Sequence, residues 1–280
     1  MLKNTNVALL VHACDRYQLL FKGFESIFSQ YWDFSTQCNL YFATEELHVQ
    51  LNGFQNIRSG KGEWSDRLAY LLKNEIREDY VLYLQEDVWF TKPISAAFFN
   101  NLFALVQTHN YRQVKLHSAD IYQTKKTDEY LHGFNVSVLD NARSRYLMSH
   151  QVTLWNRNFL IDQLPKGENP WRNENRGSKR LKKADPVIHH IDYFSQNHSA
   201  PINENLELAE RSNFHTVSLN GMFNEEFLHF VNKLPNQSEA DDNYVQKLLY
   251  HYNHELTHDG RERPRKDDIF KRVKNWILQK

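Results

Sequence analysis

The sequence YVLYLQEDVWF, residues 80–90, joins a short apolar run directly to two adjacent acids. The run Tyr80–Leu84 consists of apolar and aromatic strand-forming residues without any polar alternation. A run of this length and composition is typical of a central strand that is buried on both faces of its sheet. We therefore predict an α/β fold that is built around this strand.

The acids Glu86 and Asp87 follow the strand at its carboxyl end, where open α/β sheets bind their ligands. Neighbouring carboxylates in such a place repel each other and lose hydration, so a cation usually compensates them. A hard divalent cation that bridges the carboxylates to a diphosphate would do this. The alternative is a solvated acidic turn, and the segment before the strand favours the ligand site.

That segment contains a glycine loop and the start of a helix. Residues 60–68 have the sequence GKGEWSDRL, and apolar residues continue at helical spacing to Leu72 and Ile76. Ser65 is the predicted N-cap of this helix. The order of glycine loop, helix, buried strand and acid pair resembles the donor-binding half of GT-A nucleotide-sugar glycosyltransferases. The resemblance is in particular to bacterial enzymes of cell-surface polysaccharide and lipopolysaccharide synthesis, which carry WSDRL before the helix.

The resemblance implies a GT-A, Rossmann-like fold with a mixed, mainly parallel sheet that is flanked by helices. It also implies a uridine diphosphate (UDP) sugar as donor and Mn²⁺ or Mg²⁺ as cofactor, with Glu86 and Asp87 as metal ligands. The acid motif of the family is Asp-x-Asp or Asp-Asp, so Gln85-Glu86-Asp87 departs from it and keeps only Asp87. Arg67 would contact the diphosphate and Asp66 the ribose or base, and the alternative is a solvent-facing ion pair.

A second match to the same bacterial enzymes lies far along the chain. There, a strand that ends in Gln precedes a helix, a Pro-Trp-x-x-Glu segment and a Gly-Ser-x-Arg tail. Gln151, Pro170-Trp171, Glu174 and the sequence GSKR at 177–180 follow this pattern. The resemblance implies that Gln151 and Trp171 contact the acceptor, Trp171 as an apolar platform for a sugar face.

Glu174 has a chemical role in this interpretation. An inverting transferase needs a carboxylate that removes the proton of the acceptor hydroxyl as this hydroxyl attacks the anomeric carbon. The departing diphosphate needs positive charge nearby. We predict Glu174 as the base, whereas the alternative is a surface acid that pairs with Arg172, Arg176 or Lys179.

Other candidate residues follow further apolar runs that predict strands. After Val7–Val11, the resemblance assigns Asp15 and Arg16 to the nucleotide, and their alternative roles are helix capping and a surface charge. After the strand 39–43, Thr44 or Glu45 would contact the base. GT-A enzymes sometimes supply a late histidine as a metal ligand. In the predicted strand 187–193, His190 or Asp192 could have this role, although a lone histidine is more often structural.

Composition bounds the class of protein. The 280 residues suffice for one large α/β domain, predicted over 1–232, and a C-terminal helical extension over 233–280. A formal net charge of zero does not indicate a nucleic-acid partner. Cys14 and Cys38 suit a reducing compartment, and no transmembrane or secretory pattern is present, which predicts a cytoplasmic protein.

The C-terminal extension predicts two helices, over 244–252 and 269–277. The second carries Lys271, Arg272, Lys274 and Lys280 opposite its apolar stripe. Such a helix suits peripheral contact with an anionic membrane and a lipid-linked acceptor. The alternative is packing on the main domain or on a homodimer partner.

The sequence therefore leaves three functions open. The first is transfer of a sugar from a nucleotide diphosphate to a glycan or lipid-linked glycan. The second is nucleotidyl transfer to a sugar phosphate, which also uses an α/β sheet with carboxylates but usually a basic glycine-rich loop that residues 12–17 lack. The third is a degenerate GT-A fold that only binds glycans or protein partners, which the glutamine at position 85 favours.

Overall fold

The computed structural model describes residues 5–202 and 211–262. Its helices are α1 (Gln18–Tyr31), α2 (Trp64–Asn74), α3 (Ala96–His109), α4 (Arg157–Asp162), α5 (Pro170–Ala184) and α6 (Glu239–Asn253), with the 3-10 helices η1 (Asp15–Tyr17) and η3 (Glu225–Lys233). Its longer strands are β1 (Val7–His12), β2 (Asn39–Thr44), β3 (Gln55–Arg58), β4 (Tyr80–Leu84), β6 (Gln113–His117), β11 (Thr153–Asn156), β12 (His189–Gln196) and β13 (Ser212–Thr216). The shorter strands are β5 (Val88–Phe90), β7 (Thr124–Lys125), β8 (Tyr130–Leu131), β9 (Phe134–Asn135), β10 (Ser137–Leu139), β14 (Ser218–Leu219) and β15 (Met222–Phe223).

One mixed sheet organises the described part of the chain. Its strand order is β3-β2-β1-β4-β11-β6-β12-β10-β7, with β13 paired to β12 and β5 paired to β13. β1, β2, β3 and β4 are parallel neighbours, and β12 is parallel to β6 and β13, whereas β11 runs antiparallel between β4 and β6. The predicted α/β class with a mixed, mainly parallel sheet is confirmed.

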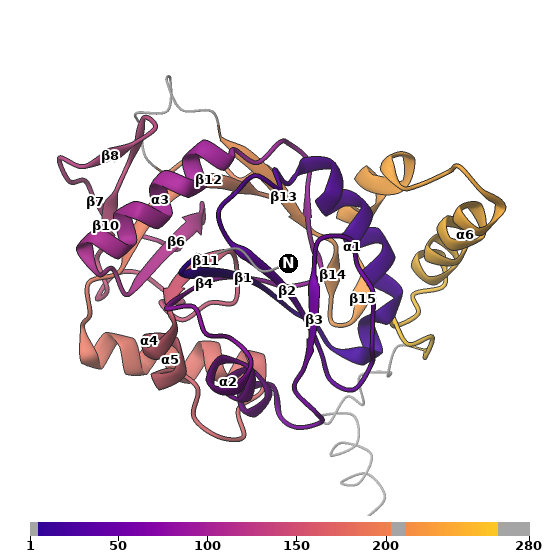
Figure 1. Cartoon of the computed structure of the whole chain (residues 1–280), viewed down its shortest axis with the longest axis horizontal. Coiled ribbons are helices and arrows are strands. Elements are labelled where there is room, and N and C mark those ends of the chain that lie inside the picture. The colour runs from indigo at the N-terminus through magenta and orange to yellow at the C-terminus, as the bar shows by residue number, and fades with distance from the viewer. Residues whose placement is uncertain (1–4, 203–210, 263–280) are drawn as a thin grey trace, which may run out of the picture.

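The central strand β4 is buried on both faces because helices cover both sides of the sheet (Figure 1). Tyr80, Leu82 and Leu84 pack into the apolar core under α1 and α3. Val81 and Tyr83 point to the opposite face and pack into the core under α2, α4 and α5. Alternate residues of one strand thus supply two cores, which explains the absence of polar alternation in its sequence.

The helix α6 lies beside α1 (Figure 1). The hydroxyl of Tyr244 accepts a hydrogen bond from the Gly23 amide at 2.8 Å and donates one to the Leu19 carbonyl at 2.9 Å. Lys22 and Asp241 form an ion pair at 2.8 Å. The first predicted C-terminal helix therefore packs on the main body of the chain.

The second predicted C-terminal helix, over 269–277, lies outside the described residues, together with the basic side chains assigned to it. Within the described ranges, none of the helices combines the length and apolar character needed to cross a membrane.

One local prediction was wrong. Ser65 is not the N-cap of α2, because the helix begins at Trp64 and its N-cap residue is Glu63. The Ser65 hydroxyl instead accepts a hydrogen bond from the Glu168 amide at 2.9 Å and so ties α2 to the segment before α5. Residues 118–135 contain the short strands β7, β8 and β9, with β7 at an edge of the main sheet and β8 paired antiparallel to β9.

Candidate functional site

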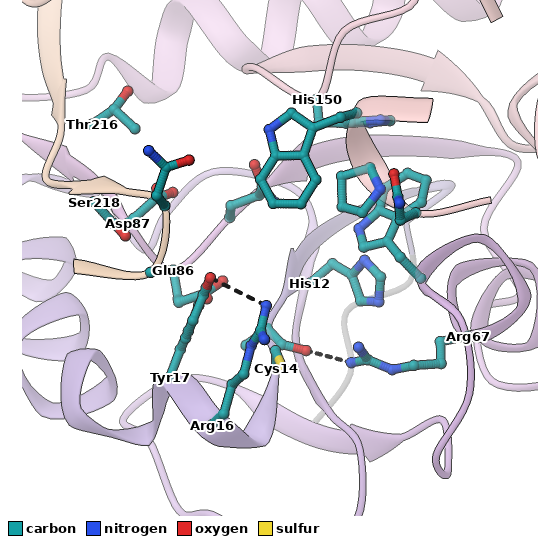
Figure 2. A pocket seen from close by; sticks show the side chains of 18 of the residues that line it. His12, Cys14, Arg16, Tyr17, Arg67, Glu86, Asp87, His150, Thr216 and Ser218 are labelled. Carbon is teal, nitrogen blue, oxygen red and sulfur yellow. Dashed lines mark hydrogen bonds between the residues drawn. The ribbon is translucent and has the colours of Figure 1, made fainter. Parts of the chain in front are cut away.

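A cavity of about 600 Å³ opens at one edge of the sheet (Figure 2). Its volume is in the range of small-molecule sites. The residues that line it are His12, Ala13, Cys14, Arg16, Tyr17, Glu45, Gly62, Glu63, Trp64, Arg67, Gln85, Glu86, Asp87, His150, Gln151, Asn169, Pro170, Trp171, Glu174, Thr216, Ser218, Leu219, Asn220 and Gly221.

The sheet itself determines where this cavity lies. The loop after β1, the loop after β2, the acid pair after β4 and the end of β13 all contribute to its lining. These strands run in the same direction, so their carboxyl ends meet at one edge, where open α/β sheets bind ligands. The segments that begin α2 and α5 complete the lining of the cavity.

The acid pair lies in the wall of the cavity. Glu86 is 3% exposed, and Asp87 is partly buried with its Oδ1 atom shielded from solvent and without a hydrogen-bond partner. Burial raises the pKa of Glu86, and the charge of Asp87 raises it further. Burial also raises the pKa of Asp87. The backbone of the pair is fixed by the carbonyl of Asp87, which accepts a hydrogen bond from Val217 at 2.9 Å.

This donor set fits a hard divalent cation. Carboxylate oxygens are preferred ligands of Mg²⁺ and Mn²⁺. The buried Asp87 Oδ1 atom without a partner is the observation that favours a cation here, because a shielded carboxylate oxygen costs free energy until a partner compensates it.

The structure does not place His190 with this acid pair. His190 is fully buried on β12, and its Nε2 atom contacts the His117 carbonyl at 3.0 Å. The strands β11 and β6 separate β12 from β4 in the sheet. Three inter-strand steps correspond to about 14 Å, so His190 and Asp87 do not reach a common ion. Asp192, the other late candidate, instead pairs with Arg211 at 2.8 Å.

Glu174 lies on α5 and faces the same cavity. The helix begins at Pro170 and is capped by the Asn169 side chain, which accepts a hydrogen bond from the Arg172 amide at 2.9 Å. One turn later, Glu174 Oε1 accepts a hydrogen bond from the His150 amide at 3.0 Å. Burial raises the pKa of Glu174, which is the direction that makes a carboxylate a stronger base.

The alternative role of Glu174, a surface acid that pairs with Arg172, Arg176 or Lys179, does not hold for Arg176. Arg176 pairs with Glu168 at 3.8 Å, and Arg180 contacts the same carboxylate at 3.1 Å. Arg176 and Arg180 thus pair with Glu168 and not with Glu174, whose carboxylate lines the cavity.

Three further predicted residues line the cavity. Arg16 extends from η1, with its guanidinium 5.0 Å from the centre of the Tyr17 ring, and Figure 2 shows both side chains pointing toward Glu86. Gln151 has a buried Oε1 atom without a hydrogen-bond partner. Trp171 is 58% exposed and lies in the first turn of α5, so its ring is accessible to a ligand.

Three predicted donor-binding residues lie at the correct edge but use their side chains for other contacts. The Asp15 carboxylate accepts hydrogen bonds from the amides of residues 45–47, at 2.8–3.0 Å. Thr44 donates to the Leu47 carbonyl at 2.6 Å. Asp66 accepts a hydrogen bond from Gly167 at 3.3 Å. None of the three lines the cavity, and each stabilises a loop that surrounds it.

Arg67 lines the cavity, but its guanidinium donates hydrogen bonds to other residues of the protein. Its Nη2 atom donates to the Ala13 carbonyl at 2.6 Å, Nε donates to Ser59 Oγ at 3.1 Å, and Nη1 lies 3.3 Å from Glu45 Oε1. The guanidinium therefore connects the loops that follow β1, β2 and β3. This differs from the predicted direct contact to a diphosphate.

Arg67→Lys is expected to lower stability by about 2 kcal/mol, because lysine lacks the planar fork that reaches several loops and leaves buried acceptors without donors. Donor affinity should fall as well, since the loops would lose their fixed positions. Urea denaturation and nucleotide titration measure the two effects. Arg58→Lys, an exposed position on β3, is the matched control and should change neither.

Several lining residues escaped prediction. His12, Trp64 and His150 form a ring cluster, with centroid distances of 5.7 Å between His12 and Trp64 and 4.1 Å between Trp64 and His150. Burial lowers the pKa of both histidines, so these rings are neutral near pH 7. The sequence around His12 and His150 carries no signal that distinguishes these two from the other histidines.

The segment 216–221 also lines the cavity and was missed. Its turn residues Asn220 and Gly221 have φ values of 55° and 77° and connect β14 to β15. A side chain at Gly221 would approach the Tyr17 hydroxyl to 3.2 Å. The Asn-Gly dipeptide is the usual signal of such a hairpin and would have identified the turn, although not its place beside the acid pair.

Comparisons with known proteins give only distant likenesses. No protein-family profile matches the sequence. No curated protein matches it either. Among solved structures, the chain is similar to residues 1–349 of TarS from S. aureus, with a TM-score of 0.45 and 11% identity over 89% of this chain and 71% of that chain. The same protein in complex with UDP-GlcNAc gives 0.44 and 12% over 89% and 72%. A UDP-glucose pyrophosphorylase complexed with UDP-glucose gives 0.40 and 10% over 69% and 90%.

Proposed function

We propose that this chain is a glycosyltransferase that moves a sugar from a UDP-sugar to a glycan or lipid-linked glycan, with inversion, in the synthesis of a cell-surface polysaccharide or lipopolysaccharide. The observation that carries the proposal is that Glu86, Asp87, Glu174 and Trp171 line one cavity, although they come from distant parts of the chain. A buried acid pair and a separate carboxylate with a raised pKa are the groups that such a transfer needs.

The cavity has two sides that suit the two substrates. The loops after β1, β2 and β4 carry Arg16, Glu45 and the acid pair, which suit a nucleotide diphosphate. The start of α5 carries the exposed Trp171 and, one turn later, Glu174, which suit a sugar hydroxyl and its apolar face. The reacting carbon would lie between these sides.

The chemistry follows from this division. Glu174 takes the proton of an acceptor hydroxyl while the hydroxyl oxygen forms a bond to the anomeric carbon. The bond between that carbon and the diphosphate oxygen breaks on the opposite face, and its electron pair leaves with the nucleotide diphosphate. Arg16, on the diphosphate side, stabilises the developing negative charge. A divalent cation held by Glu86 and Asp87 would supply further positive charge to the leaving group.

The test separates the three functions that the sequence left open. The protein is incubated with UDP-sugars and Mn²⁺, with and without glycan acceptors, and released nucleotide is quantified. Release of UDP that rises with acceptor is the expected result. Formation of pyrophosphate from UTP and a sugar phosphate would instead show nucleotidyl transfer. Nucleotide binding without turnover of any donor would show a binding module.

A further inference from the structure

Three histidines from separate segments come together beside β13. His198 lies in the turn after β12, His215 lies on β13, and His229 lies on η3. One nitrogen of each imidazole lies within 4.8 Å of the corresponding nitrogens of the other two. None of the three lines the cavity that holds the acid pair. The neighbouring Thr216 does line it, because successive residues of a strand point to opposite faces.

The backbone holds His198 in place over His215. The Ser199 amide donates to the Gln196 carbonyl at 2.8 Å, and the two residues between them, Asn197 and His198, have φ values of 47° and 59°. This left-handed conformation is uncommon for residues other than glycine, although Asn and His tolerate it better than most. Asn197 anchors the turn on β13, because its Oδ1 atom accepts a hydrogen bond from Thr216 at 3.0 Å. The rings of His198 and His215 are 4.6 Å apart as a result.

The Glu226 carboxylate contacts two of the three histidines, and the Nε2 atom of His215 lies 3.3 Å from Asn213 Nδ2, a contact that a bound ion would replace. Glu226 accepts a hydrogen bond from His215 Nδ1, and its Oε2 atom lies 3.7 Å from His229 Nε2. Metal-binding histidines usually donate their second ring nitrogen to such a carboxylate, which fixes the tautomer and makes the other nitrogen a better ligand.

The ligand nitrogens, which lie up to 4.8 Å apart, would have to move slightly closer to bind one ion. Ligand nitrogens at the usual zinc distance in a tetrahedral site lie about 3.4 Å from one another. His198 and His229 are exposed, so their rings can rotate toward the buried His215 without repacking a core. Edge-to-face and tilted contacts between the rings would not by themselves need a supporting carboxylate.

We propose that His198, His215 and His229 bind one zinc ion, with Glu226 as the carboxylate that orients His215 and the fourth position open to water. Imidazole ligands suit zinc and neighbouring transition metals, whereas Mg²⁺ prefers oxygen ligands such as those of the acid pair. The ion would join the turn at 196–199, β13 and η3. The ion would thus hold β13, the strand that ends at the cavity, against the two neighbouring segments. This proposal does not depend on the proposed reaction.

The experiment uses full-length protein without a polyhistidine tag, treated with a chelator and then titrated with zinc in a calorimeter. One zinc per chain is expected, together with a higher melting temperature, because the ion binds the native state. Co²⁺ in place of zinc should give visible absorption bands of a tetrahedral site. His198→Ala and His229→Ala should each remove this binding, and Glu226→Gln should weaken it by about 10- to 100-fold.

Two matched variants make the result specific. His48→Ala removes an exposed histidine outside the cluster and should bind zinc as the parent does. Asp87→Asn should also retain it, which distinguishes this site from the acid pair. Zinc binding that persists in the double variant of His198 and His229, or that disappears in Asp87→Asn, would overturn the proposal and leave the proposed transferase function untouched.

Discussion

Glu174→Gln is expected to lower kcat by about 10²- to 10⁴-fold, the usual contribution of a general base. Glutamine keeps the shape of the side chain, and its amide oxygen still accepts a hydrogen bond from the His150 amide, but it cannot take a proton. The affinity for the nucleotide should stay within a few-fold of the parent. Steady-state transfer assays and calorimetric titration with UDP measure the two quantities.

The pH dependence of the parent gives an independent check on Glu174. A base must be deprotonated, so the transfer rate should fall as the pH decreases through the pKa of Glu174. Burial raises this pKa, so the fall should occur at a higher pH than for an ordinary carboxyl group. Glu174→Gln should lose this limb of the profile.

Control variants connect the effect to this carboxylate. Glu46→Gln changes an exposed acid, 58% accessible, that pairs with Lys61 on the surface and should leave the rate unchanged. Glu63 is another acid in the wall of the cavity. Full activity in Glu174→Gln together with loss of activity in Glu63→Gln would assign the base to Glu63 and contradict our proposal.

The sequence predicted the parts of the site that depend on local pattern. The apolar run Tyr80–Leu84 predicts a central strand of the sheet, and Glu86 and Asp87 must then lie at the carboxyl end of that strand because they follow it in the sequence. Trp171 and Glu174 lie within the first two turns of a well-capped helix, but their roles came from the resemblance to bacterial transferases and not from local pattern. The position of the acid pair could therefore be predicted without knowledge of its tertiary neighbours.

The other assignments failed where a tertiary partner decides the role of a side chain. Asp15 and Thr44 lie at the ends of the correct strands, but nearby backbone groups occupy their oxygen atoms. The order of strands in the sheet separates His190 from the acid pair, and nothing local in the sequence gives this order. The segment 216–221 reaches the cavity only through pairing between β13 and β5, which the sequence pattern did not reveal.

Asp87→Asn is expected to stabilise the metal-free protein above pH 7 and to remove most of the transfer activity. Burial raises the pKa of Asp87 in the folded protein above its value of about 4 in the unfolded chain. Between these two pKa values, the folded state binds more protons than the unfolded state, so the free energy of unfolding falls as the pH rises. Asparagine has no proton to lose, and Glu86 would no longer face a charged neighbour.

The expected gain in the free energy of unfolding is at most about 4 kcal/mol at pH 8, since burial raises the pKa of Asp87 from about 4 to about 7 and each pKa unit corresponds to about 1.4 kcal/mol. The gain should shrink toward pH 5, where the acid pair of the parent is protonated. Urea denaturation with a chelator at several pH values measures it. Asp162→Asn, an exposed position on α4, is the matched control and should show no such trend.

With added Mn²⁺, the parent should gain more stability than Asp87→Asn. An ion that binds only the native parent at about 100 times its dissociation constant adds about 2.7 kcal/mol, whereas Asp87→Asn lacks one of the two carboxylates and gains less. A variant that is destabilised equally at every pH, and that responds to Mn²⁺ as the parent does, would show that Asp87 has a structural role only. The same buried carboxylates that lower stability without a cation are those that hold a cation against a diphosphate, so stability and activity should change in opposite directions at this position.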